Sequence, residues 1–329
     1  MSEEKSKTTG KSLTSKLFSG VGPILLILIA LFVVFSVIRG DVFLSGDNIQ
    51  DLLLSTAVNG ITALGMTCCI ICGGVDLAAG STIGMAAMVV SYFTSGQIAE
   101  GGLVPVFVAM LIAVVVGALI GFINGILIND GGLPPFIATI GMQIIIRQSI
   151  NLIFEARIIA QLPTEFTDIA LNTVFGIPVM AFVWFVLAII TWLMIKFTPF
   201  GRNIFAVGSN AETARLSGIS LRATRCGAWM YSGVMSAIAG ILLCARLGNG
   251  IPSTGSENYE FMAIASSVVG GASMSGGEGS VIGTFIGAII LQTIRNGGII
   301  IGMNAHLLEM IVGAIIIIAV LFDKNSGSN

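Results

Sequence analysis

Long apolar runs separated by short polar stretches make up almost the whole chain after residue 20. A helix of about 20 mostly apolar residues is long enough to cross the hydrocarbon core of a membrane. The runs therefore predict about ten transmembrane helices. The predicted spans are residues 21–38, 50–72, 82–98, 103–123, 134–154, 178–197, 226–246, 258–272, 281–299 and 306–322. The eighth and ninth are short and broken by glycines, so they either bend or re-enter, and eight or nine spans are alternatives to ten.

The composition is that of a membrane protein. Of the 329 residues, 55% are hydrophobic and 10% are charged, and the mean hydropathy is +0.99, whereas soluble domains carry about 25% charged residues. The 42 glycines suit helices that pack closely in lipid. We expect an all-α polytopic membrane protein, with a transmembrane domain over residues 21–323 and cytoplasmic tails over residues 1–20 and 324–329.

The distribution of basic residues predicts the orientation. Four lysines precede the first span, and because short loops rich in lysine and arginine stay in the cytoplasm, we expect the N-terminus there. Six spans then place the stretch 198–225 in the cytoplasm, and ten spans return the C-terminus to the same side. The basic residues in or beside that stretch are Lys196, Arg202, Arg215, Arg222 and Arg225. The acidic loop 155–177 falls outside. No small-residue cleavage site follows the first span, which we expect to stay in the mature protein.

Two glycine-rich segments are similar to each other. Residues 73–84 (GGVDLAAGSTIG) and 270–283 (GGASMSGGEGSVIG) both begin with a glycine pair and end in an Ile-Gly that opens an apolar run. Glycine-broken segments repeated in two halves of a chain are typical of a transport pathway. The predicted spans place both segments on one side of the membrane, whereas an inverted repeat needs opposite sides. The alternatives are a re-entrant segment or chance similarity among small residues.

The residue types that carry most enzyme chemistry are sparse. Cys69 and Cys72 form a C-x-x-C inside an apolar run, where packing is a better interpretation than redox or metal chemistry. His306 is the only histidine, and no G-x-x-x-x-G-K-[ST] motif for ATP occurs. We therefore predict no catalytic residue, no metal site and no cofactor bound by this chain. An integral membrane enzyme is disfavoured.

The polar stretch 198–225 predicts a short helix. Pro199 and Gly201 are expected to end the preceding helix, and either Ser209 or Asn210 can cap the free amides of a new one. The new helix is expected to cover residues 211–217.

Three features support this helix. Glu212 in its first turn suits the positive end of the helix dipole, and Arg215 lies near its other end. Gly218 suits the left-handed residue that commonly ends a helix. We expect a rigid helix of about two turns, to which a structureless basic loop is the alternative.

Several sequence motifs of the chain resemble those of a known family. Glu212, Ala214 and Gly218 match E-x-A-x-x-x-G, a reduced form of the E-A-A-x-x-x-G signature of permease subunits of ABC importers, with Thr213 in place of an alanine. Further blocks, in order along the chain, resemble the ribose, xylose, arabinose and galactose class of these permeases. The blocks are GGVDLAAGS (73–81), NGILI (124–128), PPFIATIG (134–141), TPFGRNIFAVGSN (198–210), ARLSGI (214–219), GGASMSGGEGSVIGTFIGA (270–288) and NGGIIIG (296–302).

The resemblance implies the pore-forming subunit of an ATP-driven monosaccharide importer in a bacterial inner membrane, with ribose as the default sugar. The implied partners are an ATPase with two nucleotide-binding halves, which binds Mg-ATP, a periplasmic or lipid-anchored sugar-binding protein, and a second permease copy, with a homodimer expected. Membrane lipid surrounds the chain, and no nucleic acid is implied.

The resemblance also makes the helix over residues 211–217 a coupling helix for the ATPase. The implied coupling residues are Glu212, Ala214, Arg215 and Gly218. The arginines in this stretch either pair with acids of the ATPase or anchor the loop at anionic headgroups.

Polar residues inside the predicted spans are candidates for the pore. Gln143, Arg147 and Asn151 are spaced four apart and share one helix face, which either lines the pore or hydrogen-bonds to another helix. Asp76 is either a functional charge within the membrane or a helix cap. The candidate pore-lining residues are Asn59, Asp76, Asn124, Gln143, Arg147 and Asn151.

The stretch 248–260 (GNGIPSTGSENYE) is predicted to lie outside. It either contacts the sugar-binding protein or forms a solvated loop. The candidate contact residues are Arg246, Asn249, Glu257 and Glu260.

The main alternative is a secondary transporter of a small polar solute, driven by an ion gradient. Such a transporter needs acids within the membrane to bind H⁺ or Na⁺. Asp76 and Glu309 fall near the ends of predicted spans, so the sequence offers few deep acids.

Overall fold

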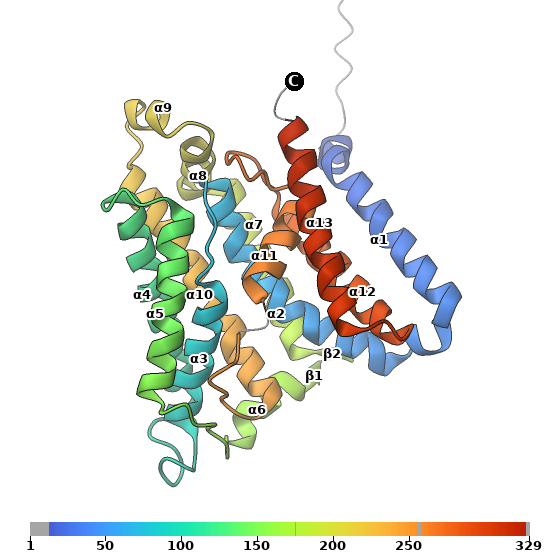
Figure 1. The fold of residues 1–329 in the computed structure, drawn as a ribbon, viewed down its shortest axis with the longest axis vertical. Helices are drawn as coiled ribbons and strands as arrows, with labels where there is room; N and C mark the ends of the chain where they lie inside the picture. The colour runs from blue at the N-terminus through green and yellow to red at the C-terminus, as the bar shows by residue number, and fades with distance from the viewer. Residues whose placement is uncertain (1–12, 175, 256–257, 327–329) are drawn as a thin grey trace, which may run out of the picture.

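The computed structural model describes residues 13–174, 176–255 and 258–326, and nearly all of its regular structure is helical (Figure 1). The first helices are α1 (Leu13–Phe43), α2 (Gly46–Ile71), α3 (Ala79–Thr94), α4 (Val106–Asn129), α5 (Pro135–Ile153) and α6 (Thr164–Leu171). An antiparallel hairpin of β1 (Thr173–Val174) and β2 (Ile177–Pro178) follows. The remaining helices are α7 (Val179–Phe197), α8 (Pro199–Ser209), α9 (Ala211–Leu216), α10 (Leu221–Leu247), α11 (Tyr259–Val269), α12 (Val281–Ile300) and α13 (Ala305–Ser326).

Six helices in the described part of the chain are long and apolar enough to cross a membrane. They are α1 from Gly22 onward, α2, α4, α5, α7 and α10. These helices support the predicted polytopic all-α class. A helix also lies at every other predicted span, but α3, α11 and the apolar part of α13 are shorter. The number of ten crossings therefore stays a prediction.

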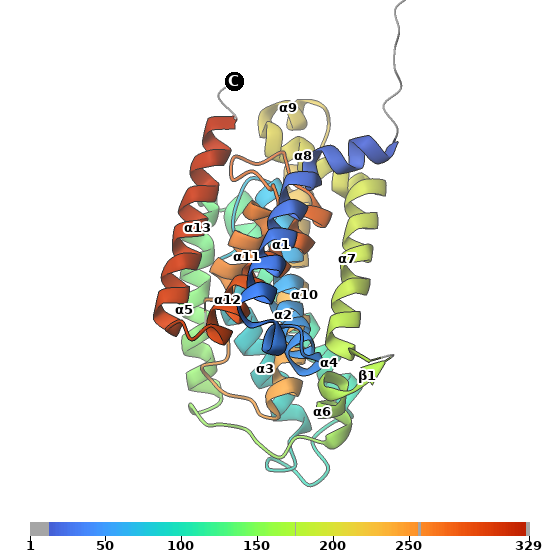
Figure 2. The ribbon, with the colours of Figure 1, turned by 90° about the vertical axis from the view of Figure 1, so that its right-hand side faces the viewer.

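The two ends of the helical bundle differ. The N-terminal end of α1 and the C-terminal end of α13 lie at the same end as α8 and α9, whereas α6 and the hairpin lie at the opposite end (Figures 1 and 2). We call these the α9 end and the α6 end. The basic stretch 198–225 thus lies at the same end of the bundle as the terminal ends of α1 and α13.

One local prediction needs correction, and two others gain detail. The stretch 198–225 holds a helix, α8, ahead of the predicted one, so Gly201 does not end a helix but lies in the first turn of α8. The Thr198 side chain accepts a hydrogen bond from the Gly201 amide (3.3 Å), and proline is favoured as the first residue of a helix. The loop 155–177 holds α6 and the hairpin. Helix α1 begins at Leu13, inside the predicted tail 1–20, and residues 1–12, 256–257 and 327–329 lie outside the described residues.

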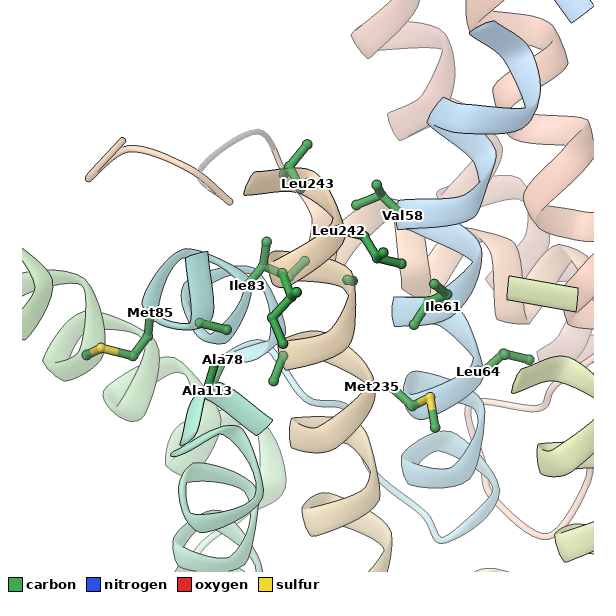
Figure 3. Close-up of a cluster of buried hydrophobic side chains, with 14 of the residues drawn as sticks. Val58, Ile61, Leu64, Ala78, Ile83, Met85, Ala113, Met235, Leu242 and Leu243 are labelled. Atoms are coloured by element: carbon green, nitrogen blue, oxygen red, sulfur yellow. The ribbon is translucent and has the colours of Figure 1, made fainter. Parts of the chain in front are cut away.

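Helices α2 and α10 form the centre of the bundle, and small residues let their neighbours approach closely. In α4, a Cβ at Gly121 would overlap the backbone of Trp229 in α10. Val58 of α2 faces Leu242 of α10 in the buried cluster shown in Figure 3. At the edge, α1 exposes apolar side chains such as Val37, which is 80% exposed, as a lipid-facing helix should. All five cysteines are buried and none forms a disulfide.

Two helices cover only part of the height of the bundle. Helix α3 has 16 residues and α11 has 11, which at 1.5 Å per residue makes them about 24 and 17 Å long, against about 30 Å of hydrocarbon core. Residues 72–78 lead from α2 into the middle of the bundle, where α3 begins, and residues 248–255 lead from α10 toward α11 (Figure 1). We call residues 72–94 the first broken crossing. Residues 248–255 with 258–269 form the second broken crossing.

The two breaks lie partly where the sequence did not indicate them. The non-helical residues 72–78 precede the third predicted span, and residues 248–255 precede the eighth, which is the short helix α11. The ninth predicted span is the continuous helix α12. Helix α3 runs to the α6 end and α11 to the α9 end (Figure 1), so the broken crossings have opposite directions. The similar segments 73–84 and 270–283 instead meet at one end, because a Cβ on Gly276 would lie 3.0 Å from the Gly73 Cα.

Candidate functional site

The predicted short helix is present as α9, and both its ends are capped. The Asn210 side chain accepts a hydrogen bond from the Thr213 amide (2.8 Å). At the other end Gly218 has φ +82°, and its amide donates to the Arg215 carbonyl (3.0 Å). A Cβ on Gly218 would meet no atom within 4 Å, so the glycine is needed here for its backbone conformation alone.

The exposed face of α9 carries one ion pair and one large apolar side chain. The Arg215 guanidinium donates to both carboxylate oxygens of Glu212, at 2.5 and 3.1 Å. This hydrogen bond, and then the opposite charge, lowers the pKa of Glu212 and raises the pKa of Arg215. Leu216 is 76% exposed, which the sequence analysis missed. Ala214, a predicted coupling residue, is only 3% exposed and faces the bundle, so a partner docking on this surface would not touch it.

The other arginines of this stretch differ in their surroundings. Arg222 pairs with Asp130, which follows α4, through Nε and Oδ2 at 2.9 Å. Arg225 lines a cavity of about 320 Å³ beside Trp229 and the loop between α4 and α5. Arg222 therefore ties α10 to the end of α4, a contact within the chain that neither prediction for the arginines included.

Glycines join α8 to both glycine-rich segments. Gly208, near the end of α8, lies so close to α2 that a Cβ there would overlap the Ile71 carbonyl oxygen and come within 2.6 Å of the Gly277 nitrogen. The Gly277 amide donates to that same Ile71 carbonyl (2.8 Å). We call Ile71, Gly73, Gly208, Gly276 and Gly277 the glycine junction. It connects the element that precedes α9 to the start of the first broken crossing and to the loop after α11.

A polar cavity of about 480 Å³ lies toward the α6 end, between α2, α10, α11 and α12. We call it the outer cavity. Its lining residues are Asp51, Ser55, Val58, Asn59, Leu243, Arg246, Leu247, Ile251, Ser253, Thr254, Gly255, Tyr259, Met262, Gln292, Arg295, Asn296 and Ile299. It contains one predicted pore residue, Asn59, and one predicted contact residue, Arg246.

Hydrogen bonds and ion pairs organise the wall of the outer cavity. Arg246 donates to Ser55 Oγ (3.1 Å) and lies 3.8 Å from an Asp51 carboxylate oxygen. Arg295 pairs with Glu309 of α13 at 3.3 Å. Asn59 is 2% exposed and its amide nitrogen donates to a serine of α11 (2.9 Å), but its amide oxygen has no partner among the described residues.

Asp76 lies in the non-helical part of the first broken crossing and is 1% exposed. Its carboxylate accepts hydrogen bonds from the Ser232 hydroxyl of α10 (2.7 Å) and from the Ala78 amide (3.1 Å). The second bond comes from Ala78, the N-cap residue of α3, and α3 has no side-chain cap hydrogen bond, so Asp76 is not the predicted helix cap. In this conformation Asp76 binds a neighbouring helix rather than an open pore.

Two of the three polar residues on α5 contact the second broken crossing. Gln143 donates to the Glu260 carboxylate (3.1 Å). Arg147 donates to the carbonyls of Thr254 (3.0 Å) and Pro252 (3.4 Å). Gln143 thus makes an interhelical hydrogen bond, the second of the two predicted alternatives, whereas Arg147 binds the non-helical segment before α11.

The third α5 residue lies apart from this group. Asn151 donates only to Gln148 of its own helix (3.5 Å). Asn124, on α4, is fully buried, and neither polar atom of its side chain has a partner.

The predicted outside contact residues are not one surface. Glu260 is 4% exposed in the first turn of α11, so it is not available to an external protein in this conformation. Asn249 is partly buried, and Glu257 lies outside the described residues. Two acids, Asp76 and Glu260, are buried in the bundle; the expectation of few deep acids stays a prediction.

These features together define a polytopic helical membrane protein that has a polar cavity between its helices and an exposed, capped helix at the opposite end. Nothing in this arrangement brings together a catalytic group of side chains among the described residues. The chain belongs to the family described as branched-chain amino acid transport system/permease component, which matches residues 48–320.

Its relatives are sugar permeases. The chain is 35% identical over 317 residues to the ribose import permease protein RbsC of Bacillus subtilis, covering 94% of this chain and 96% of that protein. It is 34% identical to the galactose/methyl galactoside import permease protein MglC of Escherichia coli, covering 93% of each chain. It is 32% identical to the D-allose transport system permease protein AlsC of the same species, covering 91% and 90%. No solved structure matches the chain. The predicted resemblance is confirmed.

Proposed function

We propose that this chain is the membrane permease of an ATP-driven importer of a monosaccharide, with a ribose-type sugar as the first substrate to test. The observation that carries the proposal is the match, over more than nine-tenths of this chain, to permeases named for ribose, allose and galactose. The family description mentions branched-chain amino acids, but these relatives are named for sugars. A transporter driven by an ion gradient is not favoured, because permeases of this family serve ATP-driven importers.

The proposed topology has ten crossings in a bacterial inner membrane. Each broken crossing completes its passage with a non-helical segment, which a membrane protein tolerates where the backbone is buried in protein. The termini and α9 are then cytoplasmic, in keeping with the basic stretch at the α9 end.

The proposed ATPase partner, with two nucleotide-binding halves and bound Mg-ATP, docks on α9. Leu216 offers an apolar side chain for a groove, and the Glu212–Arg215 pair flanks it. A short helix fixed at both ends transmits a rigid-body displacement, whereas a loose loop would absorb it. The glycine junction gives that displacement a direct route from α8 to both broken crossings.

The proposed partners at the α6 end are a sugar-binding protein and, beside this chain, a second permease copy. Arg246 and Asp51, at the mouth of the outer cavity, are exposed enough to contact a delivered sugar or its carrier.

The test is reconstitution. We expect the chain to co-purify with an ATPase. Proteoliposomes that contain both, supplied with the sugar-binding protein, should accumulate labelled ribose only when ATP is present on the cytoplasmic side of the permease. Unlabelled ribose should compete and leucine should not. Uptake driven by an ion gradient without any ATPase, or competition by leucine alone, would refute the proposal.

A further inference from the structure

We propose that the outer cavity is a monosaccharide-binding site within a single permease chain, which holds the sugar after the binding protein releases it. The inference rests on the proposed function and adds to it a location and a set of binding residues. The occupant is an uncharged, hydroxyl-rich molecule of the size of a pentose or hexose.

The volume suits such an occupant. Small-molecule sites in proteins are clefts of about 300–1,000 Å³ with a few well-placed polar groups. The outer cavity, at about 480 Å³, lies at the lower part of that range. Its walls come from four helices and from residues 251–255 of the second broken crossing, so the groups on them converge from several directions.

One group in the cavity wall lacks a partner that a sugar can supply. Asn59 lines the cavity and is only 2% exposed, and its amide oxygen is unpaired among the described residues. A buried polar atom without a hydrogen bond costs free energy. If the amide is turned over, the serine contact keeps the oxygen and the amine is left unpaired instead. In either orientation one buried polar atom of Asn59 lacks a partner among the described residues. A sugar hydroxyl, which can both donate and accept, can pair with that atom once the side chain turns toward the cavity.

The charges in the wall favour a neutral ligand. The charged residues lining the cavity are Asp51, Arg246 and Arg295. Arg246 lies 3.8 Å from Asp51, and Arg295 lies 3.3 Å from Glu309. Each charge among the described lining residues has an opposite charge beside it, so these residues offer no uncompensated charge to attract a phosphate or a carboxylate. The aromatic ring of Tyr259, also in the wall, suits the apolar face of a sugar ring.

One wall of the cavity is a segment that also contacts α5 and α3. Thr254 lines the cavity, and its carbonyl accepts from Arg147 on the side of α5. A Cβ on Gly84 of α3 would overlap the same carbonyl, so this segment packs directly on α3. Thr254 of the second broken crossing therefore lies between the outer cavity and helices α3 and α5, and we propose that the sugar occupies the cavity before the step that the ATPase drives.

The experiment uses the complete transporter with saturating sugar-binding protein. Asn59→Leu removes both polar atoms at similar size, and Gln292→Met does the same at a lining residue of α12. The matched control is Thr293→Val, next to Gln292 on α12, where the hydroxyl is fully buried and unpaired and does not line the cavity. We expect both cavity variants to lower the maximal uptake rate about 3- to 10-fold, the effect of one or two lost hydrogen bonds, and the control to keep it.

A second measurement does not depend on transport. Saturation-transfer NMR on the permease–ATPase complex in nanodiscs, with ribose and without the binding protein, should show sugar contacts in the wild type. The signal should disappear in Asn59→Leu and remain in Thr293→Val. Normal uptake by both cavity variants, or a wild-type complex that transports ribose and gives no signal, would overturn the inference. A wild-type complex that transports none of these sugars would instead refute the proposed function.

Discussion

Gly208→Ala tests whether the glycine junction transmits the displacement of α9. The added methyl would overlap the Ile71 carbonyl oxygen and lie 2.6 Å from the Gly277 nitrogen. Those two atoms are hydrogen-bonded to each other at 2.8 Å. The methyl must therefore displace α8 from α2, or break that hydrogen bond, or both.

The size of the effect follows from three contributions. Overpacking a tight contact costs about 1–3 kcal/mol, and losing one backbone hydrogen bond costs about 0.5–1.5 kcal/mol. Alanine is a better helix former than glycine by about 1 kcal/mol, which offsets part of this. The net cost is about 0.5–3.5 kcal/mol. A cost of about 2 kcal/mol would raise the ratio of open to closed glycine junctions about 30-fold.

The assay is the number of sugars imported per ATP hydrolysed in proteoliposomes. We expect this ratio to fall severalfold in Gly208→Ala while ATPase co-purification persists, because α9 itself is unchanged. Gly313→Ala in α13 is the control, since a Cβ there meets nothing within 4 Å, and it should leave the ratio intact. A Gly208→Ala transporter with wild-type coupling and an unchanged melting temperature would refute the reasoning.

Three further predictions concern α9 and the first broken crossing. Gly218→Val should weaken ATPase co-purification about 5- to 30-fold without preventing membrane insertion, because a side chain at φ +82° costs about 1–2 kcal/mol; Gly218→Asn should retain most of it, and equal retention by the valine variant would contradict this. Ser232→Ala, which leaves the Asp76 carboxylate with one bond fewer, should destabilise the protein by about 1–3 kcal/mol in thermal unfolding, whereas Ser236→Ala, one turn along where the hydroxyl has no partner, should not; equal effects would count against the bond. The pKa of Glu212 is lowered in the folded state, so its stabilisation of α9 is complete above the ordinary pKa of 4.5 and is lost as pH falls below it. ATPase binding by the wild type should therefore weaken in acid, and Glu212→Gln should remove this pH dependence. A variant with the wild-type pH profile would show that the ion pair does not support docking.

The parts of the fold that depend on neighbouring residues could be predicted from the sequence. Apolar runs of membrane length locate the helices, because lipid requires each span to satisfy its own backbone. Asn210 and Gly218 locate the ends of α9, since capping is decided within four residues. Pro199 ends α7 as expected. Because a proline is equally suited to begin a helix, this residue did not distinguish a loop from the start of α8.

The parts that depend on distant residues could not be predicted. The apolar run around Gly84 does not reveal that α3 begins only in the middle of the bundle, because that start is held by Ser232 from α10. Glu260 looks like a loop residue in sequence, yet it is buried against Gln143 of α5. The outer cavity combines residues from both ends of the chain, and no local pattern identifies such a set.

The first broken crossing also constrains how the protein is made. Its non-helical residues 72–78 are poorly suited to lipid. Their partners come late in synthesis, since Ser232 follows Asp76 by 156 residues and Gly74 packs against Trp229. A ribosome delivers α2 and α4 well before it delivers α10. We therefore expect residues 72–78 to remain at the membrane surface or beside an insertase until α10 has been synthesised and inserted. A nascent chain stopped before α10 should then leave α3 outside the bilayer. In that case the insertion of α3 depends on α10, a helix that is synthesised after it.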